Sequence, residues 1–204
     1  MQIPVLFSIV IIFVVWLQVE IRKSNKQSKK TSDHFWHIEN SANATRKVDI
    51  SFLNYIKIPI EQLPMSDKAD ATLNSYRDLI LSLNEKKILN LTGITNTELK
   101  LKYGAANITL LSEADNNYTT LVSILHRWGD RLYTLGYRSD AVNVLEYAVT
   151  CSTDVRKTYQ LLKKIYMEEN TPEKIDFLIE RLRKTNIYNK DAILHELTHV
   201  RISE

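Results

Sequence analysis

The chain has 204 residues, of which 44% are hydrophobic and 25% are charged, so it is long enough to bury a core of ordinary domain size. Its formal net charge is only +3, and the excess is concentrated near the N-terminus, which argues against nucleic acid as the main partner. The only cysteine, Cys151, excludes an internal disulfide bond and favours a reducing compartment.

An apolar stretch opens the sequence. Residues 1–19 carry no charged side chain, and Ile3 to Leu17 is apolar except for Ser8. A helix of this length measures roughly 28 Å, which is enough to span a bilayer. We therefore predict a transmembrane anchor over residues 1–21 that contacts the membrane through residues 3–19. The alternative is a cleaved secretory signal, but no basic residue precedes the apolar run and no small-x-small site follows it.

Basic residues follow the apolar stretch directly: Arg22, Lys23, Lys26, Lys29 and Lys30. Since Lys and Arg beside a span favour the cytoplasmic side, we expect a single-pass protein of the cell membrane with its C-terminal domain in the cytoplasm. Residues 22–32 lack large apolar groups and predict a flexible basic tether. The tether has a second possible role, contact with anionic lipid headgroups.

Residues 33–66 are expected to contain a short helix and then an extended apolar segment. Pro59 and Pro64 push the residues before them toward extended geometry. The apolar residues between 49 and 64 require a surface to cover them. They either pack on the helical domain that follows or dock on a partner.

Residues 67–120 are predicted to form a helical hairpin region. Apolar residues from Leu73 to Leu83 recur at spacings of three and four, which is typical of an amphipathic helix. Thr95 and Glu98 have the spacing of a capping box and predict the start of another helix. The polar run Ser112 to Asn117 is expected to break the helical pattern.

Residues 121–204 show a weak internal repeat at a shift of about 34 residues. The shift pairs Trp128 with Leu162, and it pairs Gly136 with Asn170, two residue types that tolerate a left-handed turn after a helix. We predict two helical hairpins, 118–135 with 139–149 and 155–169 with 172–184, and a final capping helix over 190–202.

A helix, a Gly or Asn turn and a second helix at this period resemble the tetratricopeptide repeat family. The first unit carries most of the family's signature: Trp128-Gly129, Leu132, Gly136, Ala141 and Ala148. The second unit departs from it at Lys163, Ile175 and Leu182. The resemblance covers about a third of the chain and implies an all-α fold. Its small residues would let two helices approach closely, and flanking helices would cap the short stack.

In many relatives of this family, the first helix of each unit lines an inner face that binds a peptide or helix from another protein. The resemblance places eight residues of this chain there: Ser123, His126, Asp130, Tyr133, Lys157, Gln160, Lys164 and Met167. His126 and Asp130 replace the first Lys and Asn of the clamp by which some members hold a carboxylate. The alternative interpretation is that all eight are ordinary solvated helix residues.

The last predicted helix contains the motif His195-Glu196-Leu197-Thr198-His199, which matches HExxH. Such a helix can bind zinc through both histidines while the glutamate acts as a general base. Only five residues follow His199, however, so a downstream third ligand is not expected. The alternative is that both histidines lie on the solvated face of a capping helix.

Taken together, these patterns predict a membrane-anchored, non-enzymatic scaffold or adaptor that needs no cofactor and binds another protein or peptide. The chain also resembles small single-pass bacterial membrane proteins that join one span to such repeats. Two alternatives remain: a zinc-dependent hydrolase using His195 and His199, and a structural subunit of a membrane complex. With Gly at only four positions, a nucleotide fold is not expected.

Overall fold

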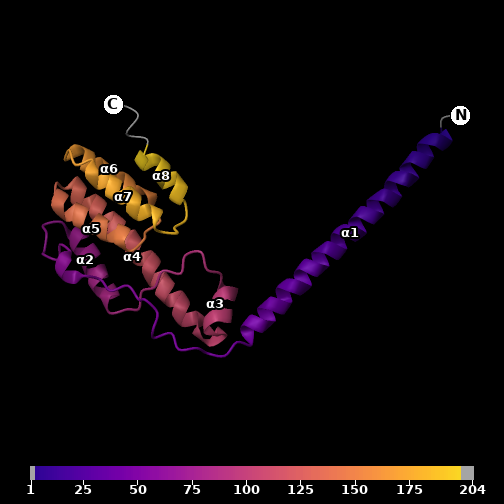
Figure 1. Ribbon diagram of the computed structural model, residues 1–204, viewed down its shortest axis with the longest axis horizontal. Helices are drawn as coiled ribbons and strands as arrows, with labels where there is room; N and C mark the ends of the chain where they lie inside the picture. The colour runs from indigo at the N-terminus through magenta and orange to yellow at the C-terminus, as the bar shows by residue number, and fades with distance from the viewer. Residues whose placement is uncertain (1–2, 199–204) are drawn as a thin grey trace. The chain divides into compact units, whose positions relative to one another are not determined.

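The computed structural model describes residues 3–198, with side chains from Val10 onwards. Eight α-helices and two short 3₁₀ helices make up its regular secondary structure, and the described residues contain no strand (Figure 1). The predicted all-α class is confirmed. The chain divides into two compact units, one of residues 1–49 and 95–108 and the other of residues 50–94 and 109–204.

The predicted membrane anchor is wrong. Helix α1 (Ile3–Asn43) is continuous, but over residues 3–198 no helix is both long enough and apolar enough to cross a membrane. The apolar run of the sequence ends at Leu17, before Gln18 and Glu20, whereas a span needs about 20 mainly apolar residues. This finding contradicts the transmembrane anchor predicted over residues 1–21 and the single-pass localisation in the cell membrane.

Residues 22–32, predicted as a flexible tether, are helical and belong to α1. The same helix includes residues 33–43, for which a separate short helix was expected. Lys is the commonest residue here, and it loses little rotamer freedom in a helix. A low apolar content thus prevents this stretch from forming a core without preventing it from extending an existing helix.

In the first unit, α3 (Asn96–Tyr103) packs against α1. Thr95 and Glu98 form the predicted capping box at the start of α3. Glu39 of α1 accepts hydrogen bonds from the ammonium group of Lys100 and, at 2.8 Å, from the hydroxyl of Thr97. These bonds lower the pKa of Glu39, so its carboxylate holds the two helices together at neutral pH.

The short helix η2 (Ala105–Asn107) completes the first unit around Asn107, which is fully buried. Its Nδ2 donates to the carbonyl oxygens of Val48 at 2.7 Å and Tyr103 at 2.6 Å. Gly104 has a φ of 87°, and a Cβ at this position would collide with the backbone of Arg46. Asn107 and Gly104 together fix the segment after α1 against α3.

The second unit holds most of α4, which begins at Ile108, and the helices that follow it. Its α-helices each contribute buried apolar side chains to one core. Helix α5 contacts α6, α6 contacts α7, and α8 contacts both α6 and α7 (Figure 1). The bounds are η1 (Ile60–Gln62), α2 (Ala71–Asn84), α4 (Ile108–Thr134), α5 (Arg138–Thr150), α6 (Arg156–Glu168), α7 (Glu173–Arg183) and α8 (Lys190–Thr198).

Helix α4 runs unbroken through residues 112–117, so the predicted break there is wrong. Leu111, Ala114, Tyr118 and Leu121 are all buried. Their spacing of three and four residues carries one apolar stripe across the polar cluster. The polar side chains between them are accommodated on the other sides of the helix.

The predicted turn residues adopt the expected conformation. Gly136 after α4 has a φ of 86°, and Asn170 after α6 has a φ of 53°, both in the left-handed region. Helices α4 and α5 approach closely at Gly129, where an added Cβ would lie 2.5 Å from Cγ of Leu145. The close approach inferred for this small residue is therefore confirmed.

Part of the apolar segment predicted over residues 49–64 packs on helices of the second unit. Ile58 and Leu63 are buried in its core, and the hydroxyl of Tyr147 on α5 donates to the carbonyl of Lys57 at 3.2 Å. Phe52 stays outside this packing, with 69% of its surface exposed. Of the two alternatives left open by the sequence, packing on the chain's own helices holds for residues 56–63.

Candidate functional site

A groove of about 310 Å³ lies between α4 and α6. We call it the inner-face groove. Five of the eight residues predicted for the inner face line it: His126 and Asp130 from α4, and Lys157, Gln160 and Lys164 from α6. Residues separated by about 30 positions in the sequence thus meet at one surface, as expected when two first helices of a repeat lie side by side.

The other three predicted residues lie around this groove rather than in its lining. Tyr133 donates its hydroxyl hydrogen to Glu168 at 2.7 Å, and the ammonium group of Lys164 lies 5.0 Å from the centre of its ring. Met167 is 42% exposed and lines a neighbouring cavity. Ser123 is half-buried and lines neither space.

The inner-face groove carries more positive than negative charge. Lys157 and Lys164 form no ion pair with any described residue, and Asp130 is the only acid in the lining. Two cations without carboxylate partners, beside a single acid, favour an anionic ligand.

His126 adds a neutral polar group to the groove. Burial lowers the pKa of its imidazole, the nearby Asp130 acts in the opposite direction, and Lys157 acts in the same direction as burial. The imidazole is therefore neutral at pH 7. Its Nδ1 is buried and has no hydrogen-bond partner among the described residues. A ligand group that forms a hydrogen bond with Nδ1 would therefore offset the free-energy cost of burying this atom.

A second cavity, of about 320 Å³, separates α6 from α8. Glu196 of α8 lies at its edge and accepts hydrogen bonds from Arg156, at 2.7 Å to Nε, and from Gln160 at 2.9 Å. Lys163 donates to the main-chain oxygen of Glu196. Three side chains of α6 thus hold one residue of α8, which fixes the last described helix on the stack.

The bond to Arg156, with smaller contributions from Gln160 and Lys163, lowers the pKa of Glu196. A lowered carboxyl pKa stabilises the docked helix above the pKa of the unfolded chain, which is about 4.3. This stabilisation is lost as the pH falls through the lower folded-state pKa. We therefore expect the α8 amides, measured by hydrogen exchange and corrected for intrinsic rates, to lose protection below about pH 4.

Glu196→Gln should lower the protection of residues 190–198 at pH 7 and remove its acid dependence. Glu180→Gln, at an exposed acid of α7 with no ion pair to a described residue, is the control and should change neither. Unaltered protection in Glu196→Gln would show that the carboxylate does not hold α8.

The HExxH motif is described only in part, because His199 lies outside the described residues. His195 and Glu196 lie on α8, and Glu196 is already engaged by Arg156 and Gln160. A carboxylate with a lowered pKa that is held by an arginine is a poor general base. No cluster of three potential metal-ligating side chains occurs among residues with described placement. The described part of the motif therefore gives no support to the zinc-hydrolase alternative.

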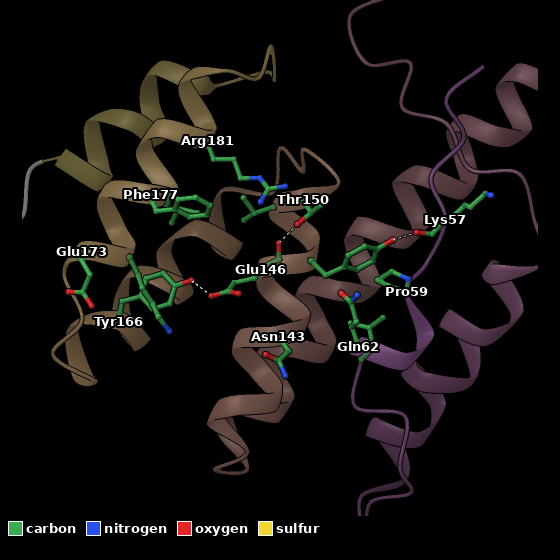
Figure 2. A pocket seen from close by; sticks show the side chains of 15 residues that line it. Lys57, Pro59, Gln62, Asn143, Glu146, Thr150, Tyr166, Glu173, Phe177 and Arg181 are labelled. Carbon is green, nitrogen blue, oxygen red and sulfur yellow. Dashed lines mark hydrogen bonds between the residues drawn. The ribbon is translucent and has the colours of Figure 1, made fainter. Parts of the chain in front are cut away.

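Figure 2 shows a different groove, of about 750 Å³, which we call the outer groove. Residues 57–63 line it together with side chains from α5, Tyr166 of α6 and side chains from α7. Tyr166 donates to the carboxylate of Glu146 at 2.7 Å across the groove. The α5 and α7 residues are Asn143, Glu146, Tyr147, Val149 and Thr150, and Glu173, Lys174, Phe177, Leu178 and Arg181.

The outer groove was not anticipated from the sequence. Its lining comes from four segments, and residues 57–63 lie some 80 positions before α5. One local signal was present: Phe177 falls on the polar side of α7, away from the stripe Ile175, Leu178, Ile179 and Leu182. Single exposed apolar residues are common on protein surfaces, so this signal alone does not identify a groove.

Comparison of the chain with models of known protein families, with curated proteins and with solved structures gives no significant match.

Proposed function

We propose that this chain is a protein-binding scaffold that holds a segment of another protein in the inner-face groove. The observation that carries the proposal is the meeting of His126, Asp130, Lys157, Gln160 and Lys164 in one groove. The repeat pattern of the sequence predicts all five as part of a binding face. A concave surface with a few convergent polar groups is the usual form of a binding site.

We further propose that α4 to α8 act as a short tetratricopeptide-like stack. Three features support this: the close approach of α4 and α5 at Gly129, the left-handed turns at Gly136 and Asn170, and the contacts of α8 with both helices of the preceding pair. In such a stack α8 takes the place of the terminal capping helix.

The charges of the inner-face groove identify the kind of segment it holds. Lys157 and Lys164 attract carboxylates, and Leu161 and Met167 offer apolar contact nearby. The buried Nδ1 of His126 provides a hydrogen bond to a polar group of the ligand. The ligand is therefore an acidic peptide segment, and its affinity falls as salt increases.

Selection from a random peptide display library against the full chain tests this function. We expect the selected peptides to be rich in Asp and Glu and to bind Lys157→Gln/Lys164→Gln at least about tenfold more weakly, because two charge-assisted hydrogen bonds are lost. Fluorescence anisotropy of the synthetic peptides measures this change.

The matched control is Lys86→Gln/Lys184→Gln, which removes two exposed lysines that line neither groove. This control should bind the acidic peptides as the unmodified chain does. Equal affinity for the inner-face variant and the control would overturn the proposed site.

A further inference from the structure

The outer groove has unpaired positive charge at one end. Arg181 is half-buried in its lining, and its guanidinium forms no ion pair with a described residue. In Figure 2 its side chain lies near Phe177 and Thr150. A partly desolvated guanidinium without a carboxylate is a ready partner for an anionic group, which it can bind through two parallel hydrogen bonds.

The acids of this groove do not neutralise that end. The carboxylate of Glu146 already accepts the hydroxyl hydrogen of Tyr166 at 2.7 Å. Glu173 begins α7, about two turns before Arg181, and Figure 2 places it on the far side of Tyr166. Neither carboxylate forms an ion pair with Arg181, so its guanidinium keeps its positive charge without a carboxylate partner among the described residues.

Apolar surface adjoins the arginine. Phe177 is 65% exposed although it lines a concave surface. Leu178 and Val149, both buried, also line the groove. An exposed aromatic ring beside an unpaired arginine combines two residue types that are enriched in protein interfaces.

The chain itself shows how a peptide lies on this side of α5. Residues 57–63 pack there with Ile58 and Leu63 inserted into the core. The hydroxyl of Tyr147 donates to the main-chain carbonyl of Lys57 at 3.2 Å. Lys57, Pro59, Gln62 and Leu63 form one edge of the outer groove, so the groove adjoins a surface on which the non-helical residues 57–59 already lie.

We propose that the outer groove is a second docking site, independent of the inner-face groove, for an extended segment of another protein that carries a carboxylate beside a large apolar side chain. Arg181 receives the carboxylate, and the apolar side chain packs against Phe177, Leu178 and Val149. The charge complementarity at Arg181 selects an acidic segment. Residues 57–59, which precede η1, run along the same helix without helical structure of their own, and this favours an extended segment.

The test uses the full chain and a random dodecapeptide display library. Selected peptides are synthesised with a fluorescent label, and their dissociation constants are measured by anisotropy. We expect a class of peptides with Asp or Glu next to Leu, Ile or Phe whose affinity falls about tenfold or more in Arg181→Gln, since a charge-assisted contact is lost. The same peptides should weaken in Phe177→Ser.

Two control variants distinguish binding at the outer groove from binding elsewhere on the chain, and circular dichroism checks that the fold is retained. Arg183→Gln replaces an exposed arginine of α7 that does not line the outer groove and should leave binding unchanged. Lys157→Gln/Lys164→Gln should weaken only the peptides held by the inner-face groove. Failure of one site is thus distinguishable from failure of the other. Phe177 is exposed, so Phe177→Ser should fold with an unchanged circular dichroism spectrum.

The proposal is overturned if no selected peptide depends on Arg181, or if the Arg181-dependent peptides lack acidic residues. It is also overturned if the chain self-associates in analytical ultracentrifugation and Phe177→Ser abolishes the association, because the occupant would then be a second copy of the chain.

Discussion

Gly129→Ala is expected to destabilise the second unit by about 1–3 kcal/mol, the usual cost of overpacking a core. The new Cβ would lie 2.5 Å from Cγ of Leu145, in a part of the core where Leu145 itself is fully buried. Helix propensity alone predicts the opposite sign, a gain of about 1 kcal/mol for alanine over glycine. Denaturant unfolding of the full chain, followed by far-ultraviolet circular dichroism, therefore separates the two effects.

A double-mutant cycle identifies the contact. Leu145→Ala alone should cost about 2–5 kcal/mol through loss of buried volume. The double variant Gly129→Ala/Leu145→Ala should be less destabilised than the sum of the single variants, because the collision is gone. Stabilisation by Gly129→Ala, or strict additivity in the cycle, would contradict the close approach of α4 and α5.

Asn107→Asp is expected to open the first unit locally. The carboxylate would face the two carbonyl oxygens of Val48 and Tyr103 that now receive hydrogen bonds from Nδ2, and the position is fully buried. An unpaired charge there costs several kcal/mol unless it takes up a proton. We expect the amides of residues 96–107 to lose hydrogen-exchange protection, and Asn107→Ala to lose less, about 1–3 kcal/mol, because it only removes the donor.

Asn96→Asp is the control for this experiment. Asn96 is exposed in the first turn of α3, where a negative charge is favourable to the helix dipole. This variant should retain full protection. Equal protection in Asn107→Asp would show that the hydrogen bonds of Asn107 do not hold the first unit together.

The helical hairpins could be predicted because their signals are local. The turn residues Gly136 and Asn170 and the capping box of Thr95 and Glu98 act within a few residues of chain, and all took the expected conformation. The break predicted at 112–117 is wrong because the buried stripe through Leu111 and Ala114 continues across the run of polar residues. Burial of one helix face overrides the composition of the others.

The N-terminal predictions relied on composition. An apolar stretch followed by basic residues indicated a span and a tether, whereas the structure has one continuous helix α1 in which no described part could cross a membrane. Residues 22–32 lack a core-forming face, but they retain the propensity to extend a helix that is already formed. Composition alone does not separate these outcomes.

The two grooves differ in how far the sequence could reveal them. The inner-face groove follows from a repeat period that puts corresponding positions of α4 and α6 on one surface, so His126 and Lys157 could be selected without a structure. The outer groove depends on where residues 57–63 pack. No periodicity relates that segment to α5, and only a tertiary structure brings Lys57 beside Tyr147.

The most direct test of the proposed function is backbone chemical-shift mapping of the isotope-labelled full chain titrated with an acidic peptide selected on it. The account predicts that the largest perturbations fall on α4 and α6 around His126, Lys157 and Lys164, and that they disappear in Lys157→Gln/Lys164→Gln. Perturbations that leave these residues unchanged for every selected peptide would contradict a binding function for the inner-face groove.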